Sequence, residues 1–158
     1  MVTISKSTLL SSIWENFYDR LNGNTSAKTV TLKDTTTSTV QNITASFPEK
    51  ILNTKSSFPV WIINSADLKW DNFTFTKDKV EGKITIDCYT TKSESADKFM
   101  DSINNSIETY KETFRSVGIY DLKLDGMNYA DADRGAFKIH IKSCTWRFNY
   151  IFTKTIAY

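Results

Sequence analysis

The sequence predicts an α+β fold: a single mixed or antiparallel sheet, two helices packed on one face of it, and an extended Thr-rich arm. Two segments, around 7–21 and 93–117, carry apolar residues at helical spacing. Other segments alternate apolar and polar residues as strands do. The segment 24–46 is dominated by Thr, Ser and Asn. The resulting order of helix, arm, strands, helix and strands places one layer of helices against one sheet.

Length and charge limit the class of protein. The 158 residues suit one domain, 1–158, that includes the arm at 24–46. A net charge of +2 is too small for a protein whose whole surface binds nucleic acid. The N-terminal segment lacks the features of a signal peptide, and no apolar run reaches transmembrane length. We therefore expect a soluble, unexported protein that does not contact a membrane.

Each predicted helix has one apolar face. The first ends at Asn22-Gly23, because both residues tolerate the left-handed conformation that closes a helix. The second begins at Ser93 or Ser95, either of which can cap it, and ends at Gly118. The apolar residues of the two faces are Leu9, Leu10, Ile13, Trp14, Phe17, Tyr18 and Leu21 in the first helix, and Ala96, Phe99, Met100, Ile103, Ile107, Tyr110 and Phe114 in the second.

The strands follow from continuous or alternating apolar runs. The segment "FPVWII", 58–63, predicts a strand buried on both faces, and 71–90 predicts a hairpin. "IYDLKLDG" predicts a short strand, and "AFKIHIKSCTWRFNYIF" a long final one. Cys88 and Cys144 lie inside apparent strands, so we expect small core residues rather than a disulfide.

The arm at 24–46 has four larger apolar residues, Val30, Leu32, Val40 and Ile43. They alternate with threonines in strand fashion, but they are too few to order about twenty residues, each of which loses ~1 kcal/mol of backbone entropy. These four residues therefore predict an arm interface, in which the arm lies across a neighbouring subunit and pairs with an exposed sheet edge.

The final strand changes parity partway along. Phe137, Ile139 and Ile141 are apolar at odd positions, but from Trp146 to Phe152 the apolar residues are at even ones. An extra residue near Ser143-Cys144 would form a β-bulge and return both sets to one face. The other face would then carry a basic and polar stripe.

The predicted stripe supplies the candidate interface residues. They are Lys138, His140, Lys142 and Arg147, which we expect to share one sheet face turned toward a ring lumen or a neighbouring subunit. Facing a lumen, the stripe would make weak, salt-sensitive contacts with the phosphates of passing DNA. The alternative is an ordinary solvated strand face.

The sequence predicts no catalytic, cofactor or metal site. His140 is the single histidine, lies between two lysines and has no orienting carboxylate in sequence. The two cysteines lack metal-site spacing. Asp131 and Asp133, which follow Asp125, resemble part of a calcium loop, but Lys142 rather than a glutamate stands at the twelfth position. Five scattered glycines exclude a phosphate-cradling loop. A binding or structural protein accounts for more of the chain than a nucleic-acid-binding module or an enzyme does.

The stretch "FPVWIINSADLKWDNFTFTKDKVEGKITIDCYTTKSESADKFMDSINNSIETYKETFRSVGIYDLKLDG", 58–126, resembles the small tail-completion or tail-terminator proteins of long-tailed viruses of bacteria and archaea. The resemblance covers the order of elements over most of the chain: an amphipathic helix, a strand pair, "IDCYTT" running into a long helix, "GIYDLKLDG" and a final aromatic strand. The arm has no residue-by-residue match in the family.

The resemblance implies a protein without catalysis that assembles as a homo-oligomeric ring, typically a hexamer. Such a ring caps the tail tube protein, joins it to the head-side connector or neck protein, and lets viral DNA pass without sequence readout. It belongs to the virion, in the tail or neck region, and is assembled in the host cytoplasm. The alternatives are a head-completion or neck adaptor ring and a small nucleic-acid-binding module.

Overall fold

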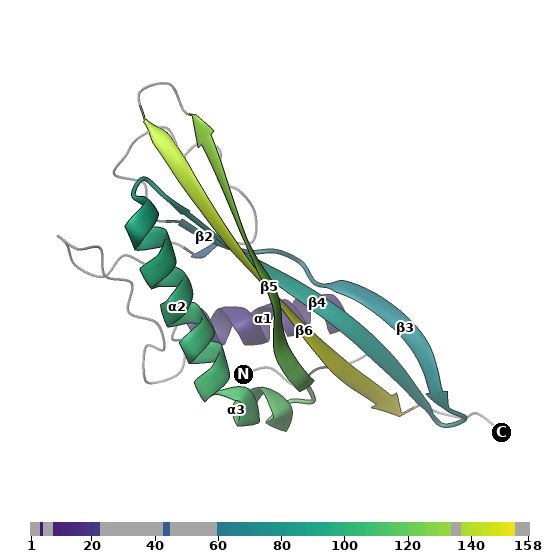
Figure 1. The fold of residues 1–158 in the computed structure, drawn as a ribbon. Helices are drawn as coiled ribbons and strands as arrows, with labels where there is room; N and C mark the ends of the chain where they lie inside the picture. The colour runs from purple at the N-terminus through teal and green to yellow at the C-terminus, as the bar shows by residue number, and fades with distance from the viewer. Residues whose placement is uncertain (1–3, 5–7, 23–42, 45–59, 134–136, 154–158) are drawn as a thin grey trace.

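The computed structural model describes residues 4, 8–22, 43–44, 60–133 and 137–153, and it confirms the predicted α+β fold (Figure 1). A six-stranded open sheet is accompanied by three helices. The elements are α1 (Leu9–Asn22), β1 (Ile43–Thr44), β2 (Val60–Ile63), β3 (Asp67–Thr74), β4 (Lys77–Thr90), α2 (Ser93–Thr109), α3 (Lys111–Ser116), β5 (Tyr120–Asp133) and β6 (Lys138–Thr153).

The long strand β4 organises the sheet. Its whole length pairs with β6, its first half pairs with β3, and its second half pairs with β2. Strands β5 and β1 extend the sheet beyond β6 and β2, and among the described strands the short β1–β2 pair alone is parallel. Figure 1 shows the hairpins β3–β4 and β5–β6 projecting toward opposite ends of the molecule. The sheet is therefore mixed but mainly antiparallel, which agrees with the prediction of a mixed or antiparallel sheet.

Helices α1 and α2 cover one face of the sheet. From α1, Phe17 packs its ring 6.2 Å from that of Phe148 on β6, and the Trp14 indole donates a 2.6 Å hydrogen bond to a β2 carbonyl. From α2, Asn104 accepts a 3.2 Å hydrogen bond from the Trp146 indole of β6. The predicted second helix breaks at Tyr110, and its last turns form α3.

The predicted bulge near Ser143-Cys144 is wrong. The β4–β6 pairing runs without a shift from Lys77 opposite Thr153 to Thr90 opposite His140. Because strand side chains alternate, the two apolar sets of β6 lie on opposite faces. We call the sheet face that α1 and α2 cover the helix side, and the opposite face the open side. The buried residues of β6 on the helix side are Cys144, Trp146, Phe148 and Phe152. A second, smaller cluster on the open side contains Ile139, Val60 and Ile62. The parity change thus reflects two clusters, one on each face.

Gly82 offers a direct test of this pairing. It lies opposite Phe148, and a Cβ built at Gly82 would lie 2.3 Å from the tip of the Phe148 ring. We expect Gly82→Ala to lower the free energy of unfolding by about 1–3 kcal/mol, because the buried ring must move. Denaturant unfolding measures the change.

Gly126→Ala is the matched control, since a Cβ there meets no atom within 4 Å. We expect that substitution to leave the stability unchanged or to raise it slightly. Equal effects of the two substitutions would contradict the packing of Phe148 over Gly82.

Candidate interaction surfaces

The predicted basic stripe is divided between the two faces of the sheet. Without a bulge, Lys138, His140 and Lys142 lie on the helix side, in step with Cys144. Arg147 has the opposite parity and lies on the open side. The prediction that these residues share one face is therefore wrong for Arg147.

Acidic partners neutralise the helix-side part of the stripe. Lys138 binds Asp131 at 2.5 Å, and Lys142 binds Asp97 of α2 at 2.9 Å. The hydrogen bond and the charge of Lys138 lower the pKa of the Asp131 carboxyl, and those of Asp131 raise the pKa of Lys138. These lysines already have carboxylate partners, which a phosphate would have to displace.

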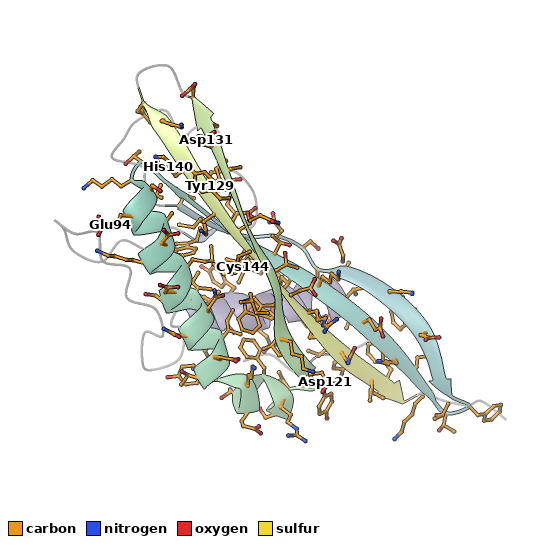
Figure 2. All side chains as sticks on the ribbon, viewed as in Figure 1. Glu94, Asp121, Tyr129, Asp131, His140 and Cys144 are labelled. Atoms are coloured by element: carbon orange, nitrogen blue, oxygen red, sulfur yellow. The ribbon has the colours of Figure 1, made fainter. Side chains whose placement is uncertain are left out.

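The side chain of His140 contacts Tyr129. The Tyr129 hydroxyl and His140 Nδ1 are 2.6 Å apart, and the two rings stack with centroids 6.0 Å apart. Figure 2 shows both residues with Asp131 toward the same end of the β5–β6 hairpin. The arrangement joins β5 to β6 and engages the imidazole in a structural contact.

A different set of cations gathers on the open side. Lys83 of β4, Arg147 of β6 and Lys123 of β5 occupy directly opposite positions on three neighbouring strands. We call these three residues the cation row. Like charges placed directly opposite one another destabilise a sheet, so sheet stability does not account for the row.

Asp125 is the counterion of this row. Its carboxylate lies 3.3 Å from Lys83 Nζ and 4.0 Å from an Arg147 guanidinium nitrogen. The β5–β6 register shifts by one residue between Leu124 and Gly126, which leaves Asp125 as the extra residue of a bulge. Bulges re-aim side chains, and this one lets Asp125 reach the open side. Sequence reasoning placed the bulge on the wrong strand.

The cation row lines a hollow of about 490 Å³ on the open side. Asn149 donates a 2.9 Å hydrogen bond to Asp121, which has a left-handed backbone with φ of 52° near the start of β5. The charged and polar lining residues are Asp67, Lys69, Glu81, Lys83, Asp121, Lys123, Arg147 and Asn149. The hollow therefore carries both signs of charge, with four cations among them.

Strand β5 is an exposed sheet edge. One side pairs with β6, and no described residue pairs with the other. All of its residues are exposed except Leu122 and Ala132, and the side chains of Leu124, Met127 and Tyr129 are 41–51% exposed. A long edge of this kind is a template for pairing with another strand.

The arm interface is tested only in part. Ile43 lies in β1, where it pairs with Trp61 of the chain's own sheet. Val30, Leu32 and Val40 lie outside the described residues. An arm that reaches a neighbouring subunit stays a prediction.

Sequence reasoning named Arg147 but missed its partners in the cation row. The available signal was the charge at Lys83 and Lys123, each in a segment predicted as a strand. To place these two lysines beside Arg147, one must know the order of the strands in the sheet and their register.

In the described part of the chain, no helix is long and apolar enough to cross a bilayer, and no group of three metal-ligating side chains is present.

Comparison with known proteins finds no protein family whose model matches this chain and no curated protein whose sequence matches it.

The two cysteines provide a test of the core. Both thiols are free and buried; burial raises the pKa of Cys144 to about 12 and that of Cys88 well above its usual value. We expect neither thiol of the native protein to react with Ellman's reagent within minutes at about pH 8–9, because the thiolate is the reactive form. In guanidinium chloride both should react. Native reaction at the rate of free cysteine would contradict this burial.

Proposed function

We propose that the protein is a non-catalytic ring subunit of a long-tailed virus, the tail terminator that caps the tail tube and joins it to the head-side connector. The observation that carries this proposal is the exposed outer edge of β5, with which no described strand pairs. The order of elements resembles that of tail terminators, and an edge strand of this length supplies the contact surface that a ring requires.

The free edges of the sheet are well placed for head-to-tail contacts. Strand β5 ends the sheet on one side, and β1 and β3 lie beyond β4 on the other. When one edge of a subunit meets a different edge of the next, the contact is heterologous, and it closes into a ring if the rotation allows. A six-fold ring is the expected closure for this resemblance.

The proposal assigns no chemistry to the titratable residues. Contact with Tyr129 engages His140 Nδ1, and burial keeps the thiols of Cys88 and Cys144 protonated. In this proposal the surfaces of the sheet bind protein neighbours rather than a substrate.

A localisation experiment tests the proposal. Gold-labelled antibody against this chain should mark the head-proximal end of headless tails, because a terminator stays with the tail tube it caps. Labelling of tailless heads alone would indicate a neck adaptor, and labelling elsewhere on the particle or nowhere would contradict both rings.

Substitution at the β5 edge tests the contact itself. Leu124→Glu places a charge on a side chain that is 41% exposed, so we expect the fold to persist and ring assembly to weaken at least about tenfold. Sedimentation velocity and negative-stain imaging, with and without tail tubes, measure assembly.

Leu10→Glu is the control, because Leu10 has a similar exposure of 47% but belongs to α1 rather than to β5. Circular dichroism checks that both variants fold. Assembly of Leu124→Glu at the wild-type level, or a wild-type chain that forms no ring in either condition, would contradict the proposed use of β5.

A further inference from the structure

The proposed ring does not explain why three cations lie next to one another on the open side of the sheet. Lys83, Arg147 and Lys123 face one another across β4, β6 and β5, an arrangement that weakens a sheet. One carboxylate, Asp125, is within ion-pair distance of two of them. Lys123 forms no ion pair with any described residue. Asp67 of β3 lies directly opposite Lys83, and Glu81 and Asp121 line the same hollow, so the three cations have carboxylates around them, but of the described residues only Asp125 forms an ion pair with the row.

The spacing of the row matches a chain of phosphates better than a single anion. Neighbouring strands lie about 4.8 Å apart, so the backbones of Lys83 and Lys123 are roughly 10 Å apart. A duplex DNA strand presents a phosphate about every 3.4 Å along the helix axis. A single anion bridges two neighbouring cations, as the Asp125 carboxylate does for Lys83 and Arg147, whereas two or three successive backbone phosphates extend along the whole row.

We propose that the cation row is a contact site for the phosphate backbone of duplex DNA. The assigned residues are Lys83, Lys123 and Arg147, and Lys69 lines the same hollow. The contact would serve the passage of DNA through the proposed ring, and that role rests on the proposed function. Binding itself needs only the folded subunit, so it is tested without a ring.

The acidic residues of the hollow set the strength of this contact. Glu81 is paired with Lys79 at 3.1 Å, and Asp121 accepts the hydrogen bond from Asn149. Asp125 competes directly with phosphate for Lys83 and Arg147. We therefore expect weak binding that falls steeply with salt, which suits DNA that must slide.

The hollow is not suited to reading bases. Its aromatic lining residue, Phe148, is buried in the helix-side core and offers no surface for stacking. Long, flexible cations that contact phosphates position a duplex without reporting its sequence. Binding should be equal for duplexes of different sequence.

The test measures binding of the full chain to a fluorescent duplex by anisotropy. For three phosphate contacts, affinity should fall about 40-fold between roughly 50 and 200 mM salt. The double variant Lys123→Gln/Arg147→Gln should bind about tenfold more weakly at the lower salt and flatten the log–log salt slope by about 1.8. Its control, Lys138→Gln/Lys142→Gln, loses the same charge on the helix side and should change affinity less than about twofold.

A second pair of variants tests the counterion. Asp125→Asn frees Lys83 and Arg147 and should tighten binding, whereas Asp131→Asn adds the same charge near Lys138 and should not. Inorganic phosphate at equal ionic strength should not compete, and vesicles of anionic lipid should not bind through these residues. Three results would contradict the proposed site: no DNA binding by the wild-type chain, an equal loss of DNA affinity in both double variants, or an equal gain of DNA affinity in both single variants. None of these results would contradict the proposed ring.

Discussion

The unbroken antiparallel pairing of β4 with β6 is the constraint on which the structure depends. Fourteen residue pairs, from Lys77–Thr153 to Thr90–His140, keep one register. Because side chains alternate along both strands, this register decides which of them face the helices and which face the open side. It brings Phe148 over Gly82 and Trp146 to Asn104, and it also places Arg147 beside Lys83. A one-residue slip would exchange the core with the charged face.

Strand β5 contrasts with this regular pair. It follows β6 with two register shifts, and its residues are mostly exposed. One shift releases Asp125 toward the cation row, and the left-handed backbone at Asp121 lies within the other. The irregularities thus occur where the strand turns charged side chains to the open side, while its free edge is left for a neighbour. The edge contact uses the outer backbone groups of β5, whereas the hollow uses side chains on the open side of the sheet, so the two proposed interactions are compatible.

Much of the fold follows from patterns within single segments. The amphipathic stripes predicted α1 and α2, and the alternating runs predicted β4 and β6, because each signal is local and strongly periodic. The error in the final strand has a physical reason. Its apolar residues were assigned to one core, so the change of parity near Cys144 required a bulge, whereas Ile139 joins a second cluster with Val60 and Ile62. A sequence read one strand at a time does not reveal that both faces of a sheet are partly buried.

The candidate sites depend on how strands that are far apart in the sequence pair in the sheet. Lys83 and Lys123 lie forty residues apart in sequence and meet Arg147 only through the order β4-β6-β5. Likewise, the acidic partners of Lys138 and Lys142 come from β5 and α2, so their neutralisation was not visible in the alternating pattern of the last strand. The predicted α+β layers required only local periodicity, whereas the charged surfaces required the register.

A reconstruction of the assembled subunits by electron microscopy would show whether β5 forms the contact between subunits. We expect a closed ring in which density from the next subunit adjoins the outer edge of β5 along its length, with the open side of the sheet turned toward the central channel. A ring in which that edge faces solvent, or subunits that associate through another surface, would contradict it.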